Sequence, residues 1–232
     1  MLQCTFQISP GAFFQVTTEG AELLYKVVVD NVKEMTTKAN DPKETILFDV
    51  CCGTGTIGLT CMKEGVVGRV VGIDVSEPAI KDAIINAEKN GYGNDDENKG
   101  LAKFIASRAE LVMQDEVRKV GSSSSSNDES SRSPMVIAVV DPARDGLHNE
   151  VLKALRNDKN IQRIVYVSCN PTGSLVKDAA QLCSPRTKKF HGLPFKPTSA
   201  QPVDMFPLTR HCEMVMVFDR MSLEECDGEE KK

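Results

Sequence analysis

Short apolar runs rich in β-branched residues recur along this chain, and segments with helical periodicity separate them. Apolar residues over 18–35, for example, recur at positions that share one face of a helix. Predicted strands cover residues 46–51, 69–75, 102–106, 135–140, 164–168 and 213–218. Predicted helices cover residues 18–35, 78–90, 110–119, 151–156 and 172–182, and one more ends near residue 64. This alternation predicts an α/β fold with a doubly wound, mostly parallel sheet.

Three of the predicted strands end in polar residues that can carry chemistry. The first is followed by Cys51-Cys52-Gly53, the fourth by Asp141-Pro142-Ala143-Arg144 and the fifth by Cys169-Asn170-Pro171. Open α/β sheets bind their ligands at the carboxyl ends of the strands. We therefore expect these three endings to form the rim of one active site.

A glycine-rich turn over residues 53–58 follows the first strand, and an acid, Asp74, ends the second. Such a turn lets the backbone approach a bound ligand closely, and an acid about 20 residues further on is placed to accept hydrogen bonds from ribose hydroxyls. The turn lacks the third glycine of a dinucleotide fingerprint and the Lys-Ser/Thr pair of a phosphate-binding loop. This combination favours S-adenosylmethionine, a nucleoside without phosphates, over NAD or ATP.

Composition narrows the class of protein. The 232 residues suit one large domain or a small pair, and 41% hydrophobic residues suffice for a core. No apolar run approaches the ~20 residues that span a bilayer, and no signal peptide is visible. Eight cysteines without a CxxC pair or a histidine at zinc spacing predict reduced thiols, no metal site and a cytosolic or nuclear setting. The net charge of −5 argues against nonspecific nucleic-acid binding by overall charge.

Segments outside these elements set the domain limits. We expect a catalytic domain over residues 1–221, interrupted at about 121–134 by a disordered serine-rich insertion, and an acidic flexible tail over 222–232. The basic run 186–211 is either a solvated face or an edge that contacts phosphates, and the sequence does not decide between the two. Near the amino terminus, paired Phe residues either pack on the core or bring Gln15 over a ligand.

Five short motifs occur in the order found in one enzyme family. They are Phe14-Gln15, Asp49 to Gly55, Asp141 to Gly146, Ser168-Cys169-Asn170-Pro171 and His211-Cys212-Glu213. On these motifs the chain resembles the RNA (uracil-C5) methyltransferases, and most closely the catalytic domain of the eukaryotic tRNA enzymes. The resemblance spans nearly the whole chain. It implies a Rossmann-like, class I S-adenosylmethionine-dependent methyltransferase fold whose last strand is antiparallel.

The resemblance also implies a mechanism that the chemistry of uracil demands. C5 of uracil is too weak a nucleophile to attack a methyl sulfonium directly, whereas a thiolate that adds to C6 makes C5 enolate-like. Cys169 is then the nucleophile, and Glu213 removes the C5 proton so that the thiol can leave. The family's cofactor-binding residues correspond to Gln15, Cys51, Gly53, Asp74 and Asp141, and its substrate contacts to Arg144 and Asn170.

Two other functions remain open. An amino-group methyltransferase would use Asp141-Pro142 to hold an exocyclic amine, although it would carry an aromatic residue where Ala143 stands. A non-catalytic RNA-binding scaffold would keep the fold without turnover, although Cys169 and Glu213 are both intact. By resemblance the substrate is a uridine in the T-loop of tRNA, and the main RNA-binding module is expected ahead of residue 1. We therefore expect a catalytic domain that binds its cofactor but methylates RNA poorly by itself.

Overall fold

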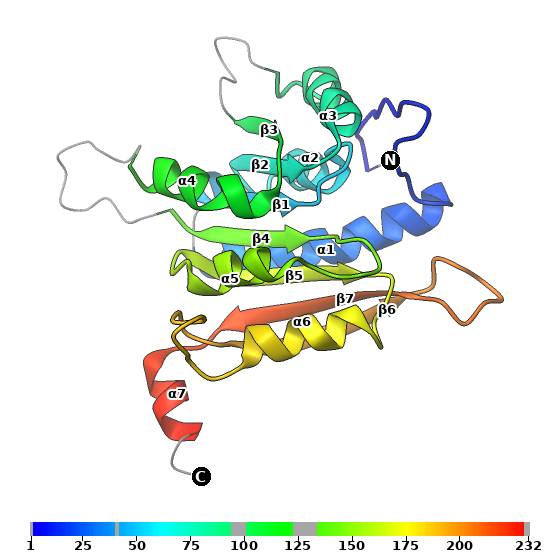
Figure 1. The fold of residues 1–232 in the computed structure, drawn as a ribbon. Coiled ribbons are helices and arrows are strands. Elements are labelled where there is room, and N and C mark those ends of the chain that lie inside the picture. Colours follow the sequence, from blue (N-terminus) through cyan, green and yellow to red (C-terminus); the bar gives the residue numbers. More distant parts are fainter. Residues whose placement is uncertain (1, 40–41, 94–100, 123–133, 230–232) are drawn as a thin grey trace.

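A seven-stranded sheet forms the centre of the molecule (Figure 1). The computed structural model describes residues 2–39, 42–93, 101–122 and 134–229. The strands are β1 (Ile46–Val50), β2 (Arg69–Asp74), β3 (Ala102–Ala106), β4 (Val136–Val140), β5 (Ile161–Ser168), β6 (Phe195–Val203) and β7 (Glu213–Arg220). Their order is β3-β2-β1-β4-β5-β7-β6; β1 to β5 are parallel, whereas β7 is antiparallel to both β5 and β6. The predicted fold class is confirmed.

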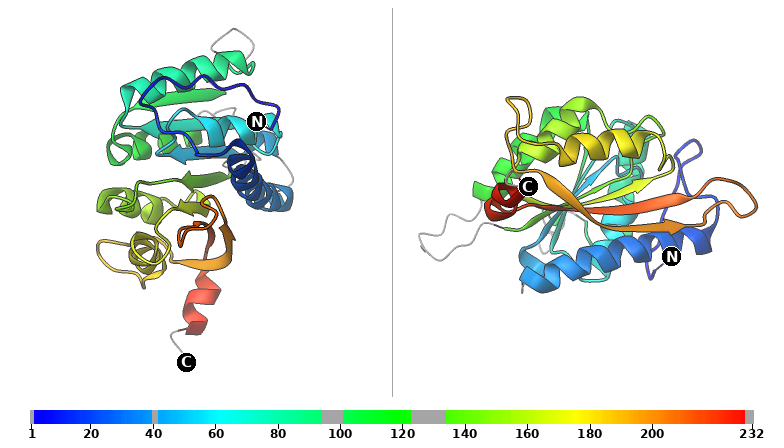
Figure 2. Two further views of the ribbon diagram at one scale, coloured as in Figure 1. Left: turned by 90° about the vertical axis from the view of Figure 1, so that its right-hand side faces the viewer. Right: turned by 90° about the horizontal axis from the view of Figure 1, so that it is seen from below.

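Helices cover both faces of this sheet (Figures 1 and 2). On one face lie α1 (Thr18–Ala39), α2 (Thr56–Lys63) and α3 (Glu77–Lys89), and on the other lie α4 (Ala109–Ser122), α5 (Asn149–Asn157) and α6 (Ser174–Cys183). The 3-10 turn η1 (Pro42–Glu44) precedes β1, and α7 (Leu223–Glu229) follows β7. Within the described ranges, no helix is both long and apolar enough to cross a membrane.

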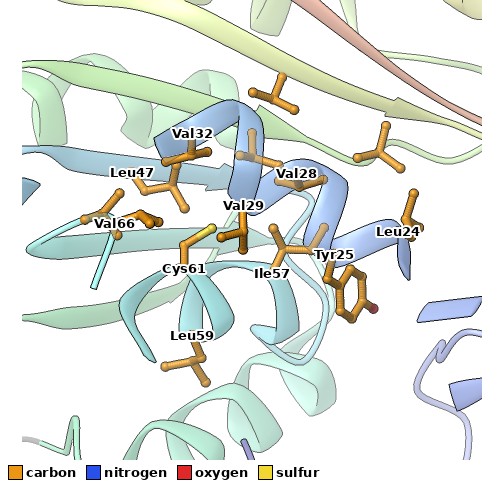
Figure 3. Close-up of a cluster of buried hydrophobic side chains, with 14 of the residues drawn as sticks. Leu24, Tyr25, Val28, Val29, Val32, Leu47, Ile57, Leu59, Cys61 and Val66 are labelled. Atoms are coloured by element: carbon orange, nitrogen blue, oxygen red, sulfur yellow. The ribbon is translucent and has the colours of Figure 1, made fainter. Parts of the chain in front are cut away.

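Each central strand contributes to two cores, because successive side chains of a strand point to opposite faces. Leu47 of β1 packs in the cluster that contains α1 and α2, whereas the next residue, Phe48, packs in the cluster under α4, α5 and α6. Figure 3 shows the first cluster, in which Val28 and Val32 of α1 lie over the sheet. Full burial of one such side chain contributes about 1.5–3 kcal/mol, so the apolar stripe of α1 holds this helix in place.

Helix α1 continues four residues beyond its predicted end at residue 35. The Thr36 and Thr37 hydroxyls donate to the Lys33 carbonyl at 3.1 and 2.8 Å. These hydroxyls therefore have hydrogen-bond partners within the helix, and the two polar residues extend α1.

The sequence pattern does not predict β6. This strand lies at the edge of the sheet, pairs with β7 alone, and has exposed side chains from Pro197 to Pro202. An edge strand needs no continuous apolar run and tolerates proline, whose missing N–H would break a central ladder. Pro197 and Pro202 are thus compatible with this position.

The segment 222–232, predicted as a flexible tail, contains α7. Ser222 and Glu225 form a capping box, in which the Glu225 N–H donates to Ser222 Oγ at 3.3 Å and the Ser222 N–H donates to Glu225 Oε2 at 2.8 Å. Glu225 also pairs with Lys196 of β6. The Ser-x-x-Glu spacing of this capping box is visible in the sequence. The flexibility expected of the tail stays a prediction. Residues 230–232 lie outside the described residues.

Helix α4 overlaps the start of the predicted serine-rich insertion. Helix α4 continues through Ser122, two residues into the segment expected to be disordered from 121. Residues 123–133 lie outside the described ranges, and the disorder expected there stays a prediction.

The basic run 186–211 is divided between opposite ends of the sheet. The Gly192 N–H donates to the Asn157 side chain at 3.2 Å, and Arg220 at the end of β7 donates to the Leu193 carbonyl at 2.9 Å. These contacts hold the first half near the amino end of β5, whereas Arg210 lies in the loop between β6 and β7, at the carboxyl end. The run therefore does not form one phosphate-contacting edge.

Candidate active site

Cys169 and Glu213 meet at the carboxyl edge of the parallel sheet, which the left panel of Figure 2 faces. Cys169 follows the last residue of β5, and Glu213 is the first residue of β7. Ser168 stands opposite Met214 at the end of the antiparallel ladder, and Cys169 and Glu213 are the residues that adjoin this last pair. The two side chains are close enough for the Glu213 carboxyl group to raise the pKa of the Cys169 thiol, after the larger effect of burial. The register thus places a thiol beside a carboxyl group.

Arg144 brings a positive charge to this pair. It lies in the loop after β4, its side chain is exposed, and its guanidinium lowers the pKa of both Cys169 and Glu213. Burial has the largest effect on the Cys169 thiol and raises its pKa, and the carboxyl groups of Glu213 and Asp141 raise it further. Arg144 therefore favours the thiolate against the acids that surround it.

Glu213 has the environment of a general base. It is 5% exposed, and burial raises the pKa of its carboxyl group above the ordinary 4.5, while Arg144 opposes this effect. A base is most effective when its pKa lies near the working pH. The raised pKa of Glu213 moves it in that direction.

Two further acids lie at the same strand ends. Burial, then Glu213 and then Asp49, raise the pKa of Asp141 to about 8. Asp49 of β1 is fully buried, and mainly for this reason its pKa is raised to about 7. Its Oδ2 accepts a hydrogen bond from the Gly58 N–H at 2.9 Å, whereas its Oδ1 has no partner among the described residues. Asp49 is not among the site residues predicted from the sequence, although an acid inside a buried apolar strand signals a special role.

The glycine turn after β1 has a backbone that other residues cannot adopt freely. Gly55 has φ +77°, and a Cβ atom there would lie 2.8 Å from the Phe104 ring. Gly53 has φ +53° and faces open space; its N–H donates to Asp74 Oδ2 at 2.9 Å. The Ser76 N–H donates to Asp74 Oδ1 at the same distance. Asp74 is therefore held beside the turn, at the end of β2.

These residues fit a nucleoside without phosphates. Both Asp74 oxygens keep lone pairs for ribose hydroxyls, and no atom lies within 4 Å of the place that a Cβ atom at Gly53 would occupy. Cys51, with φ +63° and an exposed side chain, lies at the same rim. Residues 51–58 include no Lys or Arg that would bind phosphate. In the described part of the chain, no three His, Cys, Asp or Glu side chains are grouped to hold a metal ion.

Gln15 approaches from the amino-terminal segment. It is 8% exposed, and within the described chain no hydrogen bond joins its side chain to the strand-end residues. Phe13 is 76% exposed and Phe14 is half-buried, so the two rings do not both pack on the core. The assignment of Gln15 to the cofactor stays a prediction.

Asn170 has a partner inside the protein. Its Nδ2 donates to the Arg144 carbonyl at 3.0 Å, and its own carbonyl accepts from the Gly173 and Leu175 N–H groups at 3.2 and 3.4 Å. Asn170 thus joins the residue after Cys169 to the loop that carries Arg144 and to the start of α6. The predicted contact of Asn170 with substrate stays a prediction.

Comparison with known proteins finds a matching family model and similar sequences over most of the chain. The family model described as tRNA (Uracil-5-)-methyltransferase matches residues 6–221. The tRNA (uracil-5-)-methyltransferase homolog A of Homo sapiens is 38% identical over 221 residues, which cover 95% of this chain and 31% of that protein. Homolog B of Danio rerio is 41% identical over 217 residues, which cover 93% of this chain and 40% of that protein. The chain therefore spans well under half the length of these relatives.

A solved structure shares the fold. Precorrin-6y C5,15-methyltransferase from Geobacter metallireducens superposes with a TM-score of 0.54 and 10% sequence identity, over 93% of this chain and 95% of that one. At this identity the likeness shows the fold alone, which is that of the Rossmann-like S-adenosylmethionine-dependent methyltransferases.

Proposed function

The chain belongs to the tRNA (uracil-5-)-methyltransferase family, and on this premise we propose that it methylates C5 of uridine in RNA with S-adenosylmethionine as methyl donor. The observation that carries the proposal is that Cys169 and Glu213 adjoin the last pair of the β5–β7 ladder, with Arg144 close to both. The reaction needs a nucleophile for C6 and a base for the C5 proton at one place, and a neighbouring thiol and carboxyl group support these two roles.

The proposed reaction begins when the Cys169 thiolate forms a bond from Sγ to C6 of uracil. The electron pair of the C5–C6 double bond becomes available at C5, which takes the methyl group while still holding its proton. Glu213 removes that proton, the double bond re-forms, and the bond between C6 and Sγ breaks. Cys169 leaves as a thiolate, which the charge of Arg144 favours, and Glu213 then releases its proton to solvent.

S-adenosylmethionine would supply the methyl group from its sulfonium, whose bond from sulfur to methyl would break and leave the thioether S-adenosylhomocysteine. In our proposal Asp74 accepts hydrogen bonds from its ribose, Cys51 and Gly53 line its pocket, and Gln15 and Asp141 hold the remaining polar groups. Support comes from the open space at Gly53 and from the acidic character of the strand ends, which suits a cationic group.

The substrate we propose is a uridine in the T-loop of tRNA, in the cytosol or the nucleus. Such a uridine leaves its stack to reach a site at the strand ends, at a cost of roughly a few kcal/mol. Because the net charge is −5, the proposal includes a further RNA-binding region outside these 232 residues. The relatives, which are two to three times longer, have room for one.

The test is covalent trapping. The protein is incubated with S-adenosylmethionine and tRNA that contains 5-fluorouridine, and its peptides are analysed by mass spectrometry. Fluorine at C5 cannot leave as a proton does, so the adduct on C6 persists. We expect an adduct on the peptide that contains Cys169 and none in Cys169→Ala.

Cys183→Ala is the matched control, since Cys183 is also half-buried but lies at the far end of α6. It should trap RNA like the unchanged protein. Glu213→Gln should accumulate a methylated adduct on ordinary uridine, because the C5 proton stays in place. A protein that binds the cofactor and methylates an amino group of RNA without any Cys169 adduct would instead establish the rival chemistry at Asp141-Pro142.

A further inference from the structure

Asp178 is a buried acid on α6 that the proposed reaction does not use. It is 4% exposed and lies on the apolar face of the helix, between Leu175 and Leu182. One of its oxygens, Oδ2, accepts two hydrogen bonds, from the Tyr166 hydroxyl at 2.6 Å and from the Leu147 N–H at 2.8 Å. Asp178 therefore joins α6 both to β5 and to the loop after β4.

The loop after β4 passes α6 too closely for a side chain. Gly146 has φ +84°, and a Cβ atom there would lie 2.7 Å from Asp178 Oδ2 and 2.8 Å from the Cβ atom of Ser174. The Gly146 N–H donates to the Ala143 carbonyl at 2.9 Å and closes a turn around Arg144. We call residues 143–147 the Arg144 turn. Contacts with α6 fix the position of this turn at Gly146 and at Leu147.

A second contact holds the same turn from the side of Cys169. Asn170 Nδ2 donates to the Arg144 carbonyl at 3.0 Å. Gly173 leaves room for this amide, because a Cβ atom at Gly173 would lie 2.5 Å from Asn170 Oδ1. The Arg144 turn is thus anchored at both ends, by Asn170 and by Asp178.

Tyr166 connects Asp178 to the strand that presents the thiol. It is fully buried in β5, three residues before Cys169. Burial, together with its hydrogen bond to Asp178, raises the pKa of the Tyr166 hydroxyl, which therefore stays protonated and acts as a donor. One carboxylate oxygen consequently ties the Arg144 turn to the strand that carries Cys169.

We propose that Asp178 is a positioning residue, which fixes the Arg144 guanidinium near the Cys169 thiol by holding the Arg144 turn to β5 through Tyr166. The inference rests on the proposed role of Cys169 as the nucleophile. When Asp178 is lost, the turn is free to move outward from the strand. Cys169 then loses part of the positive charge that favours its thiolate.

The test measures the thiol directly and needs no RNA. Alkylation of Cys169 by iodoacetamide is followed by peptide mass spectrometry between pH 6 and pH 10, so its outcome is separate from that of the trapping experiment. Asp178→Ala should move the pH profile of Cys169 alkylation upward by about 0.5–1 unit. The rate at pH 7.5 should fall by about two- to fivefold, because a more basic thiolate is intrinsically more reactive and offsets part of the loss.

Arg144→Ala should cause a shift of similar direction and size. The decisive measurement is the double variant: Asp178→Ala should add no further shift once Arg144 is removed, since Asp178 acts through Arg144. Shifts that add in the double variant, or an Asp178→Ala profile identical to that of the unchanged protein, would overturn the proposal.

Two variants guard against a general loss of folding. Asp178→Asn should keep a near-normal profile, because both hydrogen bonds end on one oxygen that an amide oxygen can replace. Tyr166→Phe removes one of the two bonds and should give a smaller shift in the same direction.

Asp82→Ala is the matched control. Asp82 is a buried helical acid that also accepts hydrogen bonds from one backbone N–H and one hydroxyl, both of Ser9. It should lower the free energy of unfolding without changing the Cys169 profile. A shift equal to that of Asp178→Ala would show a merely structural effect and contradict the proposal.

Discussion

At the scale of single residues, the strand ends hold ionisable groups that resist carrying a negative charge. Asp49, Asp141, Cys169 and Glu213 each have a raised pKa, and burial is the largest cause in all four. A nearby cation lowers the cost of their charged forms. Arg144 provides one such charge, and the sulfonium of the proposed methyl donor would provide another.

Asp49 allows a test of this environment through stability. Because its folded pKa of about 7 lies above the ordinary 3.8, the folded protein binds this proton more tightly than the unfolded chain does. The stability that the protonated group contributes is therefore complete below about pH 4 and is lost as the pH rises through 7. An Asn at position 49 does not titrate. From pH 4 to pH 8, the free energy of unfolding of Asp49→Asn should therefore rise relative to that of the unchanged protein by about 2–4 kcal/mol.

Urea unfolding of both proteins at several pH values measures this difference. An Asn at position 49 also buries an amide that needs an acceptor, which costs about 1–3 kcal/mol at every pH. The pH-dependent part is therefore the informative quantity. A constant difference between the two proteins from pH 4 to pH 8 would show that Asp49 is ionised throughout.

At the scale of elements, helix α3 holds the amino-terminal segment through a ladder of side chains. Asn90, Asn86 and Asp82 accept hydrogen bonds from the N–H groups of residues 5, 7 and 9 at 3.0, 2.6 and 2.7 Å. Four helical residues rise about 6 Å, and two extended residues rise about 6.7 Å. The two spacings nearly match, so one helix face can hold alternate residues of an extended segment, upstream of Gln15.

Asn86→Ala should release this segment. Asn86 is fully buried, and its amide also donates to the carbonyls of Gln7 and Thr54 at 3.0 Å. We expect the free energy of unfolding to fall by about 1–3 kcal/mol, and the amides of residues 7 and 9 to exchange hydrogen faster. Hydrogen exchange with mass spectrometry measures the exchange rates at residues 7 and 9.

Asn31→Ala serves as the control, because within the described ranges the Asn31 side chain donates to the Val27 carbonyl alone, one helical turn away. It should leave exchange in the amino-terminal segment unchanged. If Asn86→Ala also leaves that exchange unchanged, the ladder does not hold the segment.

At the scale of the whole molecule, charge and length bear on RNA binding. The chain carries a net charge of −5, and its basic run is split between opposite ends of the sheet. Affinity for RNA depends on the number of phosphates that Lys and Arg neutralise, and it weakens with salt in proportion. Among the described residues, the loops at the carboxyl edge carry Arg108, Arg144 and Arg210.

We therefore predict that this 232-residue chain binds S-adenosylmethionine but binds tRNA weakly, with a shallow dependence on salt. Calorimetry measures the first affinity, and titration of labelled tRNA at several salt concentrations measures the second. The full-length human homolog A, at matched salt, provides the comparison. Turnover on tRNA equal to that of the longer protein would refute the prediction.

Local pattern alone was enough to predict the α/β class, the parallel strands and the meeting of three polar strand ends. Buried strands and amphipathic helices each carry their own periodicity, and parallel strands bring their carboxyl ends to one edge. Cys169, Glu213 and Arg144 were identified from such endings and from family resemblance. The edge strand β6 was not predicted, because it is a strand by its position beside β7 and not by a periodicity of apolar residues.

Contacts between distant residues decided the rest. The register of β5 against β7 decides that Glu213 lies next to the end of β5, where Cys169 follows, and a shift by one residue would turn Glu213 to the other face. The partners of Asn170 and Asp178 depend on how a loop is packed against α6, and Asp49 is identified by an oxygen left without a partner. Periodicity along the chain reports which face a residue occupies. It does not report which residue, far away in the chain, will be opposite.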